Sequence, residues 1–333
     1  MKVAVSDLRE KVLAGVRKLG YQGDDAQIIA NVLLYAQMRG NNQGISKIAT
    51  GGVPHAKDIT PLQLVKENKC GALFSGGHSM VSSQRALEEA ISLAAKHGVG
   101  IVGTQKTETS SGAIGYFARQ IAKAGYIGFI TTGNGGFSPV APYGSAEGKM
   151  GTNPLAYAIP YEGGEIVFDM ATSAIAFFGI VEAVLGNKPL PENTCLDGQG
   201  NFTTDATKVM QDGSIVGAIT TFGGYKGFGL SLFVQLMGCS FAGAGFPGGY
   251  EDDGSGTVII AIDPGLLMSK EEFMTRARKQ IDAIKAAKPR AGQQVTIPGE
   301  RGDAIAAQAE ALGEIEIADA VWNKLIKFLA KPN

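Results

Sequence analysis

Short apolar runs alternate with amphipathic helices through the middle of the chain, and this alternation constrains the fold more than any other feature. Residues 85–96 carry apolar side chains at helical spacing and lead into an apolar run at residues 99–102. A second helix is expected to end at Ala124, capped at its start by Ser110 or Ser111. Further strands are predicted at residues 127–132, 155–160 and 166–168. Because strands interleave with helices, we expect an α/β fold with a mixed, partly parallel sheet covered on both faces.

Both ends of the chain are expected to be helical. Apolar residues recur at helical spacing as far as Gly20, and Asp24 starts a second helix, so the chain opens with a helical hairpin. Near the other end, Ser269 and Glu272 form a capping box that starts a further helix, and a last helix contains Leu325. We therefore expect three parts, which are helical residues 1–70, α/β residues 71–262 and helical residues 263–333.

Composition and charge exclude several classes of protein. Lys and Arg number 30 against 31 Asp and Glu, a net charge of −1, so neither nucleic acid nor a membrane surface is an expected partner. The apolar stretch at residues 230–244 is too short to cross a bilayer, and we interpret it as a buried core helix. The three cysteines are widely spaced and charged residues follow Met1 closely, so we expect a cytoplasmic protein without disulfides or a signal peptide.

Familiar phosphate-binding and catalytic motifs are missing from the sequence. The glycine-rich stretch at residues 133–138 lacks the third glycine and the helix of the dinucleotide-binding fingerprint, and residues 144–150 are one residue short of a P-loop. We expect both to be loops. His55, His78 and His97 form no triad or metal-binding pattern, so neither histidine catalysis nor a metal site is expected.

Polar and glycine-rich turns punctuate the short strands between residues 134 and 173. Backbone N–H groups in turns, hydroxyls and a carboxylate are what phosphate or ribose binding requires outside a dinucleotide fingerprint. A plain set of turns has the same composition. The residues alone leave both interpretations open.

Six segments occur in the order typical of one enzyme family. They are Gly151-Thr-Asn-Pro-Leu-Ala-Tyr-Ala-Ile-Pro160, Phe168-Asp-Met-Ala-Thr-Ser173, Leu196-Asp-Gly-Gln-Gly-Asn-Phe-Thr-Thr-Asp205, Gly223-Gly-Tyr-Lys-Gly-Phe-Gly-Leu230, Ala261-Ile-Asp-Pro264 and Ile297-Pro-Gly-Glu300. On these segments, and on the opening hairpin with Arg39-Gly40, the chain resembles the malate/L-lactate dehydrogenase family over nearly its whole length. That family also includes ureidoglycolate, sulfolactate and diketogulonate oxidoreductases and the piperideine and pyrroline-2-carboxylate reductases.

The resemblance implies a fold, a cofactor, a substrate class and an assembly. It implies a non-Rossmann nicotinamide-binding domain at residues 71–262 and a helical domain built from both chain ends. It also implies hydride transfer between NAD or NADP and a small 2-oxo carboxylate or its imine analogue, in a homodimer with the active site near the subunit interface. The positions expected to contact the cofactor are Ser138, Thr152, Asn153, Asp169, Met170, Ala171, Thr172, Ser173, Lys226, Pro298, Gly299 and Glu300.

The chain departs from the family pattern at the positions that are catalytic in the family. The family has a Ser-His-Gly triplet followed by an arginine, and this chain has Asn42-Gln43-Gly44 and Lys47 instead. A second family histidine falls on residues 109–112, and a third falls on Tyr225. The catalytic histidine is therefore replaced. We expect the catalytic positions to be Gln43, Lys47, Ser110 and Tyr225.

These replacements bear on which substrates can be reduced. A carbonyl oxygen needs a proton donor during hydride transfer, and general acid catalysis contributes about 10²–10⁴-fold, whereas a protonated imine brings its own charge. Gln43 cannot titrate but can polarise a carbonyl, and Lys47 is expected to pair with a substrate carboxylate. We therefore expect imine reduction to be favoured. The alternatives are a cofactor-binding member that has lost the dehydrogenase reaction and an enzyme of another reaction class on this scaffold.

Overall fold

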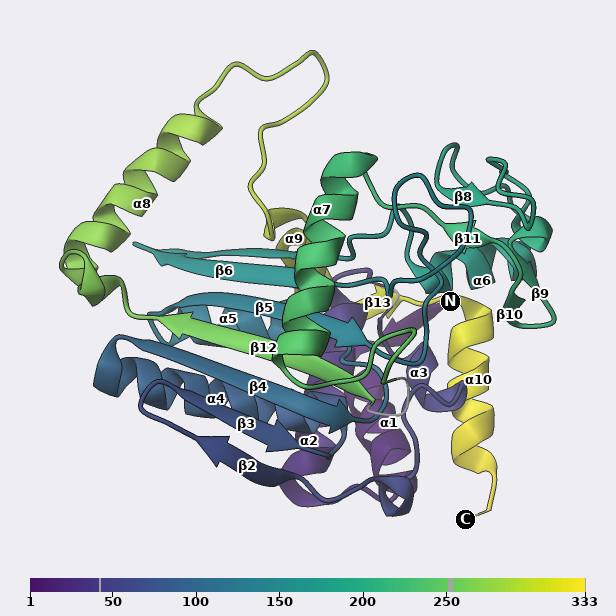
Figure 1. Cartoon of the computed structure of the whole chain (residues 1–333), viewed down its shortest axis with the longest axis horizontal. Helices are drawn as coiled ribbons and strands as arrows, with labels where there is room; N and C mark the ends of the chain where they lie inside the picture. The colour runs from purple at the N-terminus through teal and green to yellow at the C-terminus, as the bar shows by residue number, and fades with distance from the viewer. Residues whose placement is uncertain (42, 251–253, 333) are drawn as a thin grey trace.

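A seven-stranded sheet forms the centre of the molecule (Figure 1). The computed structural model describes residues 1–41, 43–250 and 254–332. From one edge to the other, the strands are β2 (Gln63–Glu67), β3 (Gly71–Ser75), β4 (Val99–Thr107), β12 (Ser255–Ile262), β5 (Ile127–Asn134), β6 (Leu155–Tyr161) and β7 (Gly164–Met170). β3 and β4 run parallel, and the other neighbouring pairs are antiparallel. The prediction of a mixed, partly parallel sheet is confirmed.

Helices cover both faces of this sheet. One face packs against α4 (Ser79–His97) and α5 (Gly115–Lys123). The opposite face packs against α7 (Tyr225–Gln235), which continues into a π-helical segment at Leu236–Phe241. α8 (Lys270–Lys285) lies beside β6, and the Ser269 hydroxyl accepts a hydrogen bond from the Glu272 N–H, as the capping box predicts.

The two ends of the chain meet in a helical layer. This layer consists of α1 (Val5–Lys18), α2 (Gly23–Met38), the short α3 (Ser46–Ala49), α9 (Glu300–Leu312) and α10 (Asp319–Ala330). The strand β1 (Lys2–Ala4) pairs with β13 (Glu314–Glu316), and α10 packs on α1 and α3. The apolar side chains of this layer share one continuous core with α4, α5 and the sheet, because buried residues of all of them contact one another.

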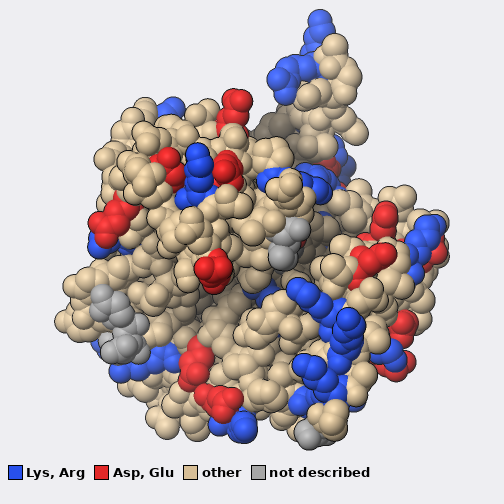
Figure 2. Space-filling model, turned by 90° about the vertical axis from the view of Figure 1, so that its right-hand side faces the viewer, with Lys and Arg blue, Asp and Glu red and all other residues tan. Residues whose placement is uncertain are grey.

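A smaller lobe with its own apolar core lies beside one end of the sheet, on the side of the molecule that faces the viewer in Figure 2. We call residues 137–150 and 171–222 the small lobe. It contains α6 (Phe177–Gly186), β8 (Cys195–Leu196), β9 (Met210–Gln211), β10 (Ser214–Ile215) and β11 (Ala218–Ile219). Its core is built from buried residues that include Val140, Met150, Ile180, Cys195, Val209 and Ile219. The lobe therefore holds its shape by contacts separate from the main core.

The helix predicted to start at Ser110 or Ser111 begins later, at Gly115. The backbone before it cannot be helical, because Thr109 and Gly112 have φ values of 78° and 70°. The serines therefore cap nothing and lie in a loop. The sequence analysis did not predict the Ala-rich helix α9, which begins at Glu300.

The apolar segment at residues 230–244 is helical, but the prediction that it is buried was wrong. Leu232, Phe233, Leu236 and Phe241 are between 42% and 64% exposed, because only one side of α7 and the π-helical segment faces the sheet. In the part of the chain that the structure describes, no helix is long and apolar enough to cross a membrane.

Candidate active site

A cavity of about 780 Å³ lies at one end of the sheet, beside the small lobe. It opens where β4, β5 and β7 end and where β12 begins, and its volume suits a small-molecule site, for which roughly 300–1,000 Å³ is usual. Eight of the residues predicted for the site line this cavity, namely Gln43, Lys47, Ser110, Thr152, Asn153, Asp169, Met170 and Ala171. Segments that are far apart in the sequence therefore meet at one place.

Lys47 is a buried cation in the wall of this cavity. It lies on α3 with 1% of its surface exposed, its Nζ donates a hydrogen bond to Ser110 Oγ at 2.8 Å, and it lies 4.7 Å from the centre of the Phe178 ring. No Asp or Glu of the described residues forms an ion pair with it. Burial lowers the pKa of the ammonium to about 8. A buried charge without an opposite partner is costly, and an anionic ligand would relieve that cost.

Ser110 presents a hydroxyl proton that has no protein acceptor among the described residues. Its Oγ accepts hydrogen bonds from Lys47 Nζ at 2.8 Å and from the Gly112 N–H at 3.2 Å. A hydroxyl has two acceptor lone pairs and one donor, so both lone pairs are engaged and the O–H is left to donate. Ser110 lines the cavity, and an acceptor oxygen on a bound molecule would complete its hydrogen bonding.

Asp169 is the second group in the wall whose charge is sensitive to its surroundings. It lies near the end of β7, and its Oδ2 accepts a hydrogen bond from the Gly115 N–H at the start of α5 at 2.8 Å. A Cβ on Gly115 would lie 2.9 Å from the Cβ of Asp169, so a glycine permits this close approach. Burial raises the pKa of the carboxyl to about 6. Asp169 can therefore hold or release a proton near neutral pH.

The loop that carries Ser110 is held in a strained conformation by α4. Thr109 has a φ of 78°, which is unusual for a β-branched residue. Its hydroxyl is 3.2 Å from His78 Nε2, and its carbonyl accepts a hydrogen bond from Ser79 Oγ at 3.0 Å. His78 Nδ1 in turn accepts from the Met80 N–H, so the ring is neutral and Nε2 donates. Burial lowers the pKa of His78 to about 3, in keeping with a supporting role outside the cavity wall.

The hydrogen bonding of Asn153 indicates whether the cavity fits a nicotinamide group. It is 1% exposed with a φ of 42°, and its Nδ2 donates to Ser231 and to Gln235 Oε1. Its Oδ1 is buried and has no partner among the described residues. A buried acceptor without a hydrogen bond costs about 1–3 kcal/mol, so the wall favours a ligand with an N–H at this point. The carboxamide of a nicotinamide is such a donor, and the residues present therefore fit this group.

Other predicted site residues lie outside the lining of this cavity. Thr172 and Ser173 are buried behind it, where Thr172 Oγ1 donates to the Asn153 carbonyl at 2.9 Å and so supports the wall. Ser138 lines a neighbouring cavity of about 690 Å³ in the small lobe. Tyr225 and Lys226 are exposed at the start of α7.

The turn of Pro298, Gly299 and Glu300 packs against β7, also away from the cavity lining. Val167 N donates to the Pro298 carbonyl at 3.3 Å, and Glu300 forms an ion pair with Lys285. Asn42, the neighbour of Gln43, is outside the described residues.

Three phenylalanines from the small lobe form an apolar wall that sequence reasoning missed. Phe137, Phe177 and Phe178 all line the cavity. The rings of Phe137 and Phe177 pack edge to face with centres 4.8 Å apart, and those of Phe177 and Phe178 are 5.6 Å apart. The only signal in the sequence is the Phe177-Phe178 pair soon after Ser173, and the same pair is equally typical of a helix that packs into a core.

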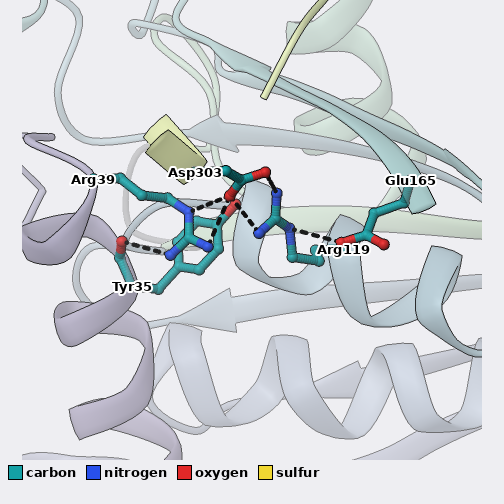
Figure 3. Close-up of polar contacts among 5 residues, drawn as sticks. All are labelled: Tyr35, Arg39, Arg119, Glu165 and Asp303. Carbon is teal, nitrogen blue, oxygen red and sulfur yellow. Dashed lines mark hydrogen bonds and ion pairs between the residues drawn. The ribbon is translucent and has the colours of Figure 1, made fainter. Parts of the chain in front are cut away.

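A second group of charges lies between the helical layer and the sheet (Figure 3). Asp303 on α9 accepts hydrogen bonds from Arg39 Nη2 at 3.0 Å and from Arg119 Nη1 and Nη2 at 2.7 and 2.6 Å. Arg119 Nε also lies 3.5 Å from Glu165, and the Arg39 guanidinium lies 3.9 Å from the centre of the Tyr35 ring. The two guanidiniums hold the pKa of Asp303 below its usual value. These contacts join α2, α5, β7 and α9.

Comparison with known proteins agrees with this architecture. The family model described as malate/L-lactate dehydrogenase matches residues 3–326. The chain is 31% identical to L-sulfolactate dehydrogenase of Methanocaldococcus jannaschii over 88% of this chain and 86% of that protein. It is 30% identical to the NAD(+) ureidoglycolate dehydrogenase of Escherichia coli strain K12 over 98% of this chain and 95% of that protein.

A third relative and a solved structure extend the comparison. The chain is 31% identical to Δ1-pyrroline-2-carboxylate reductase 2 of Burkholderia multivorans, over 76% of this chain and 73% of that protein. The solved structure of the sulfolactate dehydrogenase from Methanocaldococcus jannaschii superposes with a TM-score of 0.83 at 29% identity, covering 98% of this chain and 96% of that one. The chain therefore belongs to the malate/L-lactate dehydrogenase family of NAD(P)-dependent oxidoreductases.

Proposed function

We propose that this enzyme reduces a small 2-imino or 2-oxo carboxylate by hydride transfer from NADH or NADPH, with imines as the favoured substrates. The observation that carries the proposal is the buried Lys47 ammonium, which lines the cavity without an anionic partner among the described residues. A substrate carboxylate would supply that partner. The names of the relatives described above also refer to small carboxylates, and one of them is a cyclic imine.

Lys47 and Asp169 together match the charges of an imine substrate. A protonated 2-imino carboxylate is a zwitterion, so its carboxylate can bind Lys47 while its positive nitrogen is attracted to ionised Asp169. A 2-oxo carboxylate has no positive nitrogen and instead needs a proton on its oxygen. Asp169 could supply that proton only in its neutral form, below its pKa of about 6. Near neutral pH the cavity therefore favours the imine.

The other side chains of the cavity would bind and orient the substrate and cofactor. The Ser110 hydroxyl would donate to an oxygen of the substrate, and the Gln43 amide lines the same space and cannot change its charge. When bound, NADH or NADPH would supply the hydride. Asn153 Oδ1 would accept from the nicotinamide carboxamide, with Thr152, Met170 and Ala171 in the same wall. Ser138, Thr172, Ser173, Lys226 and the turn at residues 298–300 remain proposed contacts for the rest of the dinucleotide.

The decisive experiment separates cofactor binding from turnover. Purified protein is first titrated with NADH and NADPH by fluorescence, and we expect saturable binding of at least one of them. Oxidation of the bound nucleotide is then followed with Δ1-piperideine-2-carboxylate, pyruvate and oxaloacetate. Faster turnover of the cyclic imine supports the proposal, and a clear preference for the 2-oxo acids contradicts it. Binding of the nucleotide without turnover of any substrate would identify a family member that has lost the reaction.

We also propose that the enzyme is a homodimer, as the family resemblance implies. The outer side of α7 and the π-helical segment exposes Leu232, Phe233, Leu236 and Phe241, an apolar surface that water disfavours. We expect analytical ultracentrifugation to give twice the mass of one chain. Replacing Phe233 and Leu236 together by Asp should halve that mass, whereas replacing Leu267, which is 91% exposed and lies between β12 and α8, should leave it unchanged.

A further inference from the structure

We propose that the cavity selects substrates with a single negative charge and an apolar side chain or ring, and that Phe178 is the residue that sets this preference. The inference rests on the proposed function and narrows its substrate class. It follows from two independent properties of the cavity wall, which are its count of positive charges and the position of its aromatic side chains.

The cavity can neutralise one anionic group. Among the described residues that line it, Lys47 is the single side chain with a positive charge, whereas Asp169 and Glu108 are acidic. The cations Arg39 and Arg119 lie outside the lining and are already paired with Asp303. A substrate with a second carboxylate or a sulfonate would bring a negative charge toward acidic side chains. Like charges placed together without a counter-ion repel each other strongly, so such a substrate would bind poorly.

The apolar wall begins at the cation itself. Lys47 Nζ lies 4.7 Å from the centre of the Phe178 ring, so a carboxylate bound to Lys47 has its neighbouring carbon atoms within reach of that ring. The rings of Phe177 and Phe137 extend the same wall. A carbon chain or ring would bury apolar surface against these side chains, and this burial would strengthen binding. A charged group at the far end of the substrate would lose its hydration there without gaining an oppositely charged partner.

The test compares substrates of equal length that differ in one charge. With saturating cofactor, kcat/KM is measured for 2-oxopentanoate against 2-oxoglutarate and for 2-oxobutanoate against oxaloacetate. Because like-charge contacts are so costly, we expect each monoanion to exceed its dianion by at least about 30-fold. The affinities of the same four acids for the cofactor complex are measured by calorimetry. Preferential binding of the monoanions without turnover would support the inference while contradicting the proposed reaction. Equal or stronger binding of the dianions would overturn the inference even if the reaction occurs.

Two variants assign the preference to Phe178. F178R places a second cation beside Lys47, and we expect the ratio of monoanion to dianion kcat/KM to fall by at least about tenfold. F178L keeps the position apolar and is expected to retain the ratio of the unchanged enzyme. Phe178 is partly exposed, so both variants are compatible with folding, which thermal unfolding checks. An unchanged ratio in a folded F178R enzyme would remove Phe178 from the inference.

Discussion

Lys47 and the pair of Arg39 and Arg119 are buried or half-buried cations with opposite surroundings. The two arginines share Asp303, and Arg119 also contacts Glu165, so their charges are balanced within the protein (Figure 3). Lys47 has a serine and an aromatic ring as neighbours and no carboxylate among the described residues. In our proposal the two arginines stabilise the fold, whereas Lys47 binds the substrate. Paired charges stabilise the native state as a set, and a buried charge without a partner would be stabilised by a substrate carboxylate.

The largest expected effect comes from removing the unbalanced cation. K47M should lower kcat/KM by about 100-fold or more, because a charged hydrogen bond to the substrate is lost. The same change should raise the free energy of unfolding, by an amount on the order of 3 kcal/mol at pH 7, because a buried charge is replaced by an apolar chain of similar shape. Activity and urea unfolding measured on one preparation check both signs.

A pH series provides the control for that stability effect. The pKa of Lys47 is lowered from 10.5 to about 8 by burial, so the unfolded chain binds more protons than the native one between these values. The unchanged enzyme should therefore gain stability as pH rises from about 8 to 10.5, and K47M should lose this gain. A K47M protein that is less stable than the unchanged enzyme at pH 7 would contradict the interpretation that the buried charge of Lys47 lowers the free energy of unfolding.

Removing the charge of Asp303 should have the reverse effect to K47M, because stability should fall while activity is kept. D303N leaves two guanidiniums without their shared carboxylate, and we expect the free energy of unfolding to fall by about 2–3 kcal/mol. Asp303 lies outside the cavity lining, so kcat/KM at a temperature where the variant is folded should change by less than about threefold. The control is D282N, which removes a partner of the exposed Arg278 on α8 and should leave the free energy of unfolding almost unchanged.

A smaller effect should appear in the pH dependence of catalysis. With a 2-oxo acid, kcat/KM should decrease as pH rises through about 6, because the neutral form of Asp169 is lost. With a cyclic imine, it should increase over the same range, because ionised Asp169 attracts the positive nitrogen. D169N should remove both trends. Parallel profiles for the two substrate classes would show that Asp169 does not discriminate between them.

The smallest effect is expected for S110A. This variant keeps the Lys47 ammonium but removes an acceptor and the hydroxyl that faces the cavity, and a loss of about three- to tenfold in kcat/KM is the expected result. S110T keeps the hydroxyl and should restore most of the activity. Loss of activity equal to that of K47M would mean that Ser110, and not the cation, dominates binding.

The fold was largely predictable because its signals are local. Ser269 caps α8 as expected, since capping depends on residues within one turn. The start of α5 could not be predicted in this way. The positive φ of Thr109 before it is imposed by His78 and Ser79, which are far away in the chain. Asp303 gave no local signal either, since its partners lie up to 264 residues away.

Part of the candidate site was predictable for a different reason. Lys47, Ser110 and Asp169 were found through the family resemblance and through departures from it, and all three line one cavity. The aromatic wall was not found, because Phe137, Phe177 and Phe178 have the pattern of ordinary core residues. Only the packing of the small lobe against the end of the sheet gives these rings their position.

The separate core of the small lobe has a consequence for how this cavity can change. The aromatic rings belong to the small lobe, whereas Lys47 belongs to the helical layer and Asp169 to the central sheet. A substitution inside the lobe that tilts α6 would move the rings relative to the charges without touching either set. Substitutions in the core of the small lobe could thus change the size of the substrate that fits, while Lys47, the proposed carboxylate-binding residue, keeps its position.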